Sequence, residues 1–318
     1  MINRRDFLRS SAMISLASLA GTQNLFAMNP EIQRLGVQLF SLPKMLDQDF
    51  ERALEMLSAI GYKEIELFGP YPFSADAAIK SWAAVTPMLG FSGSGYFGKP
   101  QSEVNTLMKK LGFTVPAMHT DFETLSTKMP ELADAANSLG AKYVVLPSIP
   151  DDKRKTAEDY SRVADQFNRI GEEAKKHGIR YAYHNHGYGF YEENGERPID
   201  IIFNETDPDL VFFEMDLFWT VAAGADPVKL LQDHKGRFKL MHVKDMKEKK
   251  QFSGDGGDAS QWFALFPFMT SAGQGVLDLP KIISTANKNG VDHFFVEQDM
   301  VNEPKVALKE SYQYLKNL

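Results

Sequence analysis

The 318-residue sequence contains no cysteine. This absence excludes disulfide bonds, thiolate metal sites and a cysteine nucleophile, and it leaves histidine, aspartate and glutamate as the side chains that can bind a metal ion. There is also no excess of positive charge, because 42 acidic residues outnumber 35 lysines and arginines and the formal net charge is −7. A general attraction to nucleic acid or to anionic lipid is therefore not expected. A small molecule is the better candidate for a partner.

The N-terminal apolar stretch, Ala12 to Ala20, is too short to span a bilayer. It follows the paired arginines Arg4 and Arg5 and leads into small and polar residues up to Ala27. This order is typical of a twin-arginine export signal, although a frayed amphipathic helix is the alternative. We therefore expect residues 1–27 to be a signal peptide, and the mature protein to be periplasmic and free of the membrane.

No break in composition marks a linker, so residues 28–318 are expected to form one domain. Eight β-rich runs alternate with segments of helical periodicity, and eight strands close a parallel barrel. The pattern predicts a single-domain (β/α)₈ TIM barrel in the α/β class. An open doubly wound sheet would need a GxGxxG motif after the first run, and none is present at Gly36 to Leu39. The runs are 35–41, 64–68, 114–119, 143–146, 180–186, 211–216, 239–244 and 293–299.

Helical patterns lie between these runs, for example at 50–60, 129–139, 157–177 and 227–233. Several of them end at a glycine, as helix C-termini favour. Two connections, 69–112 and 246–280, are longer than the rest. Long loops that follow strands usually build the rim of the functional site in a barrel.

Ionisable side chains gather at the carboxyl ends of the last four runs. Strand side chains alternate between faces, so His184 and His186 share one face with Ala182, whereas Tyr181 and Tyr183 share the other. The apolar face suits packing against helices. The ionisable groups must then point into the barrel, where burying a charge is costly without a partner.

A divalent cation would offset this cost. One candidate ligand comes from each of the four runs, and the mixed nitrogen and oxygen set suits a transition metal better than Ca²⁺. We predict one bound ion, with Mn²⁺ as the first choice and Zn²⁺, Co²⁺, Fe²⁺ and Mg²⁺ as the other candidates. The predicted ligands are His184, Asp216, His242 and Glu297.

Short motifs along nearly the whole mature chain support this hypothesis: GVQLFSL, GYKEIELFG, VPAMH, YHNH, EMDLFW, HVKD, GQGVLD and VEQD. Their order and spacing resemble the xylose isomerase-like barrels grouped as sugar phosphate isomerases/epimerases, which include inosose dehydratase. The resemblance implies a metal-dependent enzyme that removes a proton beside the carbonyl of a sugar or keto-sugar. The family holds its metal with a Glu, Asp, His, Glu quartet, and Asp216, His242 and Glu297 match its last three positions.

The first position of that quartet differs, because His184 replaces the carboxylate. In the epimerases that carboxylate and the one on the eighth strand exchange protons on opposite faces of the substrate. Its loss disfavours two-base epimerisation and leaves Glu297 as the candidate base, which suffices for enolisation or for β-elimination by a lyase or hydratase. A keto-sugar, an inosose or a 3-keto-glycoside would suit the lyase alternative.

Other residues are expected to contact the substrate or its reacting atoms. Lys244 is a candidate for stabilising an enediolate, with a structural ion pair as the alternative, and His186 is a further catalytic candidate. Trp219 stands where the epimerases have a substrate-binding histidine, which implies a stacking wall for a sugar ring, with a rim residue that packs the following helix as the alternative. The remaining substrate-binding candidates are His119, Glu66 and Gln38, with hydrogen bonding inside the barrel as the alternative for the last two.

Two other functions compete with this interpretation. An exported sugar-binding protein without chemistry would not need Asp216, His242 and Glu297. An apurinic endonuclease would need more ligands and a basic DNA-binding face. The segment 273–278 has no basic neighbours to bind a phosphorylated sugar. The sequence leaves the sugar, the metal and the oligomeric state open, a homo-oligomer included.

Overall fold

The structure is a computed structural model that describes residues 32–192, 195–299 and 301–318. The predicted signal peptide, residues 1–27, lies outside the described residues. Within the described part of the chain, no helix has both the length and the apolar character needed to cross a membrane.

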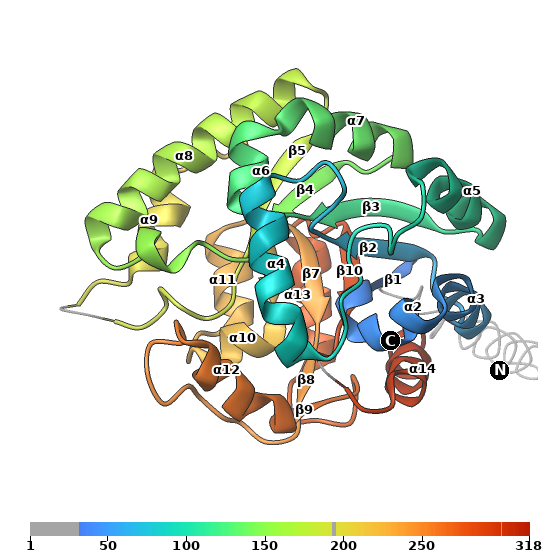
Figure 1. Ribbon diagram of the computed structural model, residues 1–318. Helices are drawn as coiled ribbons and strands as arrows, with labels where there is room; N and C mark the ends of the chain where they lie inside the picture. Colours follow the sequence, from blue (N-terminus) through green and yellow to red (C-terminus); the bar gives the residue numbers. More distant parts are fainter. Residues whose placement is uncertain (1–31, 193–194, 300) are drawn as a thin grey trace, which may run out of the picture.

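Eight parallel strands form a closed barrel, which confirms the predicted fold (Figure 1). The strands follow one another around the barrel in chain order, and the last pairs with the first through Leu35 and Phe294. They are β1 (Leu35–Gln38), β2 (Glu64–Phe68), β3 (Thr114–His119), β4 (Tyr143–Leu146), β5 (Arg180–His184), β6 (Val211–Asp216), β7 (Phe238–Val243) and β10 (His293–Val296).

Four strands end earlier than the sequence pattern predicts, and β7 does so by one residue, at Val243. β1 stops at Gln38 because its side chain accepts a hydrogen bond from the Phe40 amide and starts the 3₁₀ turn Leu39–Ser41. β5 stops at His184 and β10 at Val296. The residues after these ends belong to the loops on the carboxyl side of the barrel.

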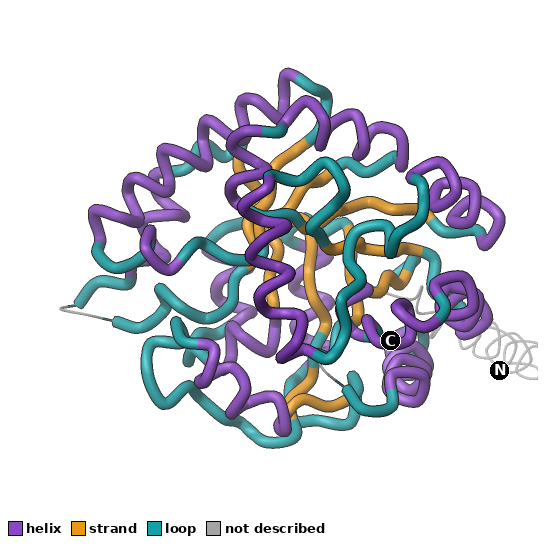
Figure 2. The backbone as a smooth tube through the Cα atoms, viewed as in Figure 1, coloured by secondary structure: helices purple, strands orange, loops and turns teal. Residues whose placement is uncertain are grey.

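Helices surround the barrel, and figure 2 shows them outside the strands. α8 (Ala157–Lys176) begins with a capping box between Thr156 and Asp159, and its Phe167 packs 5.2 Å from the Tyr181 ring and 5.3 Å from the Tyr183 ring of β5. This contact confirms the predicted alternation of faces. The other long helices of this layer are α3 (Phe50–Ile60), α5 (Gln101–Leu111), α7 (Met129–Leu139), α9 (Pro198–Glu205), α13 (Leu279–Lys288) and α14 (Pro304–Leu315), with α11 (Pro227–Asp233) shorter.

The two long connections carry structure of their own. The first contains α4 (Asp76–Leu89), a helix that buries none of its residues. The second contains α12 (Ala259–Leu265) and a two-stranded sheet of β8 (Asp245–Met246) and β9 (Met269–Thr270). The Asp245 carboxylate accepts hydrogen bonds from the backbone amides of Gly273, Gly275 and Leu277 at 2.9, 3.0 and 3.2 Å, and so holds the segment 273–278 against the rim. Three short helices complete the carboxyl side: α2 (Pro43–Gln48), α6 (Phe122–Thr127) and α10 (Leu217–Ala222).

An apolar cluster occupies the inner face of the strands. Because side chains on one face recur every second residue, the next inward position on each strand lies one step nearer the carboxyl end. That position is polar on several strands: Ala117 is followed by His119, Ala182 by His184 and Phe212 by Glu214. The barrel therefore changes from an apolar interior to a polar site within two residues.

Candidate functional site

Two sets of carboxylates lie at the carboxyl end of the barrel, and all of them are buried except Asp299, which is partly buried. We call Glu66 and Glu214 the inner carboxylates; both are fully buried and stand outside the wall of the cavity described below. We call Asp216, Glu297 and Asp299 the outer carboxylates. Sequence reasoning missed Glu214, although it shares a strand face with the predicted ligand Asp216 two residues later.

The imidazoles of His184 and His242 lie between these two sets. His184 Nδ1 is 3.0 Å from Glu214 Oε2, and its Nε2 is 3.6 Å from Asp216 Oδ2. His242 Nε2 is 2.6 Å from Glu66 Oε2, and its Nδ1 is 2.7 Å from Glu297 Oε2. A ring that donates one N–H to an inner carboxylate presents the lone pair of its other nitrogen to the outer set.

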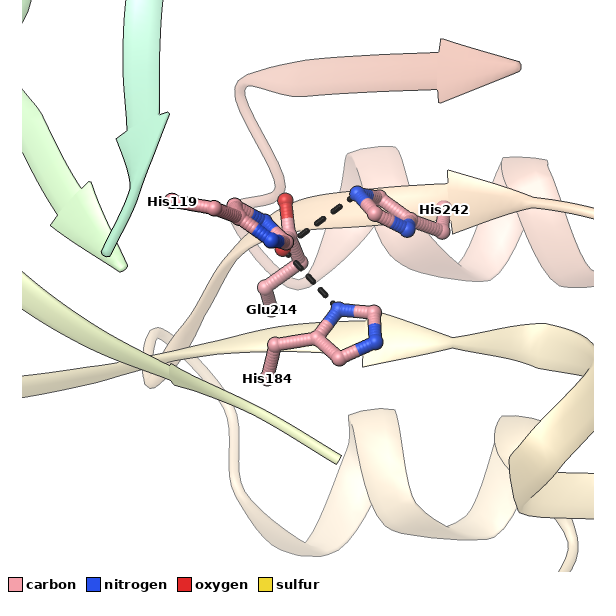
Figure 3. A group of neighbouring side chains, drawn as sticks. All are labelled: His119, His184, Glu214 and His242. Atoms are coloured by element: carbon pink, nitrogen blue, oxygen red, sulfur yellow. Dashed lines mark hydrogen bonds and ion pairs between the residues drawn. The ribbon is translucent and has the colours of Figure 1, made fainter. Parts of the chain in front are cut away.

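His119 completes the inner part of the site. Figure 3 shows His119, His184 and His242 converging on Glu214, and His119 Nε2 lies 2.7 Å from Glu214 Oε2. Burial disfavours the charged imidazole, but the Glu66 and Glu214 carboxylates outweigh it and raise the pKa of His119 to about 9. His119 also lines the cavity. It can therefore meet a substrate while holding Glu214.

Lys244 pairs with all three outer carboxylates. Its Nζ lies 2.9 Å from Asp216 Oδ2, 2.7 Å from Glu297 Oε2 and 2.5 Å from Asp299 Oδ2. Burial opposes the charge, yet these carboxylates raise the pKa of Lys244 well above its ordinary value. The side chain is 2% exposed and is not part of the cavity wall. Lys244 is therefore an ion-pair partner in this structure, which is the alternative that the sequence left open, and its contact with a substrate stays a prediction.

The buried residues fit a divalent cation. Ligand atoms of Asp216, His242 and Glu297 lie within 4.8 Å of one another, and so do those of a second group that shares His242. Among the described residues, none hydrogen-bonds to Glu66 Oε1 or Glu214 Oε1, although both oxygens are buried. Unpaired buried carboxylate oxygens are costly, and a bound cation lowers that cost. The second group comprises His119, His184, Glu214 and His242.

A cavity of about 950 Å³ opens above this cluster. One part of its wall is polar and includes His119, His184 and Glu297. Another part is apolar, and α4 contributes Trp82 and Val85 to it. Among the substrate-binding candidates Gln38 lines the cavity, while its amide donates a 2.8 Å hydrogen bond to Glu66. The other apolar side chains of the wall include Phe40, Phe68, Pro70 and Phe122.

Two substrate-binding candidates lie elsewhere. Trp219 is 1% exposed and outside the cavity wall, with its ring stacked 5.6 Å from that of Phe252. α10 turns the indole of Trp219 into the apolar cluster beneath the rim, and a stacking wall for a sugar ring at this residue stays a prediction. Glu66 is likewise buried below the cavity, where it holds His242 and Gln38.

His186 lines the cavity as a neutral imidazole. Its Nδ1 lies 2.6 Å from the Pro147 carbonyl, so Nδ1–H donates and Nε2 carries the lone pair. Burial, followed by the nearby Lys244 charge, lowers the pKa of His186 to about 3. The ring can accept a hydrogen bond from a substrate hydroxyl, but it is not a reservoir of protons at neutral pH.

The inner carboxylates should control metal affinity without touching the cavity. We expect Glu214→Gln to weaken Mn²⁺ binding by about 10- to 100-fold, because a neutral amide replaces the charged acceptor of His119 and His184 and the rings lose their orientation. Isothermal titration of the metal-stripped proteins measures this change. Glu64→Gln is the matched control, since Glu64 is also buried and accepts from a histidine, His293, at 2.8 Å. Equal affinities for wild type and Glu214→Gln would contradict the prediction.

The chain is a TIM barrel with a cluster of buried histidines and carboxylates. The cluster lies beneath a cavity at the carboxyl end of the barrel, which is where TIM-barrel enzymes have their active sites. Residues 54–318 match the xylose isomerase-like TIM barrel model, and the chain belongs to this family.

Individual relatives agree with this membership. Inosose dehydratase of Lacticaseibacillus casei is 26% identical over 274 residues, which span 82% of this chain and 87% of the relative. A sugar phosphate isomerase/epimerase from Parabacteroides distasonis has the same fold, with a TM-score of 0.68, 23% identity, and coverage of 93% of this chain and 97% of that one. The IolI protein, solved with a zinc atom, has a TM-score of 0.60 at 17% identity, covering 89% and 95%.

Proposed function

We propose that the protein is a metal-dependent enzyme that abstracts a proton beside the carbonyl of a keto-sugar and completes a β-elimination, as a lyase or dehydratase. The observation that carries this proposal concerns the two positions, one on β5 and one after β10, where the epimerases carry their pair of carboxylates. Only Glu297, after β10, is a carboxylate that lines the cavity, whereas the position on β5 is His184. The similarity to inosose dehydratase supports the same reaction type.

In this proposal the metal is held by His184, Asp216, His242 and Glu297. The alternative group around Glu214 fits less well, because His184 Nδ1 and His242 Nε2 already face carboxylates that can accept their protons. The opposite nitrogens then bind the ion, which is the usual arrangement of a metal-bound histidine. When bound, a divalent ion would act as a Lewis acid toward the substrate carbonyl.

Glu297 is placed to move the proton. Its contacts with His242 Nδ1 and Lys244 Nζ are both made by Oε2, at 2.7 Å each. Within the described residues, Oε1 is the oxygen left to accept a proton from the substrate. The neutral His186 Nε2 can fix a hydroxyl by accepting its hydrogen bond, and the imidazolium of His119 can donate to one.

Isomerisation through an enediol is the second candidate, since one base can remove a proton and return it on the same face. The two outcomes are distinguished by incubating metal-loaded protein with inosose, ketoses and 3-keto-glycosides in D₂O. An unsaturated product supports elimination, whereas a deuterated isomer of the substrate supports isomerisation. Fully loaded protein that gives neither product nor exchange with any of these compounds would reject the proposal.

The size of the cavity favours a keto-glycoside over a free sugar. Its volume of about 950 Å³ lies near the top of the roughly 300–1,000 Å³ range of pockets that enclose drug-sized ligands. The apolar part of the wall suits the group attached to the sugar. Trp82 is fixed there, because its Nε1 donates a 2.8 Å hydrogen bond to the Ser92 carbonyl.

We therefore expect Trp82→Ala to raise KM for an aryl 3-keto-glycoside by about tenfold, the scale of one lost aromatic contact, while KM for a free keto-sugar changes little. Steady-state kinetics on both substrates checks this. Phe263→Ala is the control, because Phe263 is an exposed aromatic residue on α12 that does not line the cavity. A proportional rise for both substrates would show that Trp82 supports the fold of the rim and not the second part of the substrate.

A further inference from the structure

The ammonium of Lys244 forms ion pairs with carboxylate oxygens of the candidate metal ligands. Asp216 Oδ2 and Glu297 Oε2 are 2.9 and 2.7 Å from Lys244 Nζ. The same two oxygens are 3.9 and 2.7 Å from His242 Nδ1, the nitrogen that faces the outer carboxylates. A metal ion bound by these residues would share both oxygens with a buried ammonium.

We propose that Lys244 is a built-in counter-ion that competes with the metal ion for the outer carboxylates and thereby sets the metal affinity. The inference rests on the metal site of the proposed function. Two cations that share the same oxygens repel each other, and the repulsion is poorly screened where the ammonium is 2% exposed. Lys244 therefore lowers metal affinity and limits the net negative charge of the stripped site.

Two neighbouring groups, which are not candidate metal ligands, can stabilise the Lys244 ammonium when the metal ion binds. Asp299 is not among the candidate ligands, and its Oδ2 hydrogen-bonds to Nζ at 2.5 Å. The Trp219 ring centroid lies 5.6 Å from Nζ on another side, within the range of a cation–π interaction. The ammonium can give up Asp216 and Glu297 while it keeps Asp299 and the indole. This gives the buried Trp219 and the partly buried Asp299 a role that the sequence did not reveal.

The test is the affinity for Mn²⁺ of stripped Lys244→Gln, measured by isothermal titration. We expect its dissociation constant to fall by at least about tenfold, because the competing charge is gone while a hydrogen-bond donor remains. Lys244→Arg keeps the charge and should stay close to wild type. Lys239→Gln removes the same charge from the other end of β7, where Lys239 Nζ lies 4.0 Å from Asp292, and should also match wild type.

A second measurement separates competition from a structural role. Stripped Lys244→Gln should unfold several degrees below stripped wild type, because three carboxylates lose their counter-ion, and metal loading should remove the difference. If the stripped variant does not fold, loaded proteins are compared by chelator competition, which gives the same ratio of affinities.

Equal or weaker Mn²⁺ binding by Lys244→Gln would overturn this inference alone, since Lys244 would then orient the ligands. Tighter binding by Lys244→Arg than by wild type would also overturn it, because the charge is retained. Absence of Mn²⁺ and Zn²⁺ binding by both wild type and Lys244→Gln would overturn the proposed metal-dependent function as well.

Discussion

Glu297→Gln is expected to lower turnover by about 10²- to 10⁴-fold, the usual contribution of a general base, while much of the metal is retained. The amide has the size of the carboxylate and keeps an oxygen for the ion, but it cannot accept the substrate proton. A neutral imidazole bound to metal through one nitrogen has no second lone pair to offer, because His184 Nδ1 faces Glu214. His184 therefore cannot take over as the base.

The measurement combines single-turnover kinetics with metal analysis of the same preparation. Glu64→Gln is again the matched control, because it neutralises a buried carboxylate paired with a histidine at the opposite end of the barrel. Its turnover should stay close to that of wild type. Near-normal turnover of fully loaded Glu297→Gln would place the base elsewhere, with His186 the next candidate on the cavity wall.

Asp216→Asn should abolish stable metal binding and activity together. We expect the Mn²⁺ affinity to fall by more than about 100-fold, beyond the roughly 10- to 100-fold that partners of the ligands contribute. The reason is that a neutral amide replaces a charged ligand that is fully buried. Equilibrium dialysis of the stripped protein against Mn²⁺ measures the effect.

The fold should survive this change, because Asp216 has a second role that asparagine can keep. Its Oδ1 accepts a 2.9 Å hydrogen bond from the Trp219 amide and caps α10, and asparagine caps helices equally well. Asp226→Asn provides the control, since Asp226 caps α11 in the same way but is exposed. Metal affinity of Asp216→Asn close to that of Asp226→Asn would remove Asp216 from the ligand set.

The barrel could be predicted from the sequence because its determinants are local. The alternation of Tyr181, Ala182, Tyr183 and His184 assigns each side chain to a face, and the structure places the tyrosines against α8 and His184 in the site. The same parity would have found Glu214, had it been applied to the residue two before Asp216. Glu214 and Asp216 lie on the same face of β6, so the alternation of side chains assigns both to the interior of the barrel.

The sequence by itself determined the eight-stranded barrel, the apolar and polar faces of its strands, and the gathering of histidines and carboxylates at their carboxyl ends. Those features follow from a two-residue repeat and from turns that nearby residues specify. Only the tertiary structure decided which nitrogen of His184 and His242 faces which carboxylate, that Lys244 pairs with Asp299, and that α10 buries Trp219. These contacts join residues from different strands and loops, so they depend on ring orientation and packing across the barrel, which no local sequence pattern encodes.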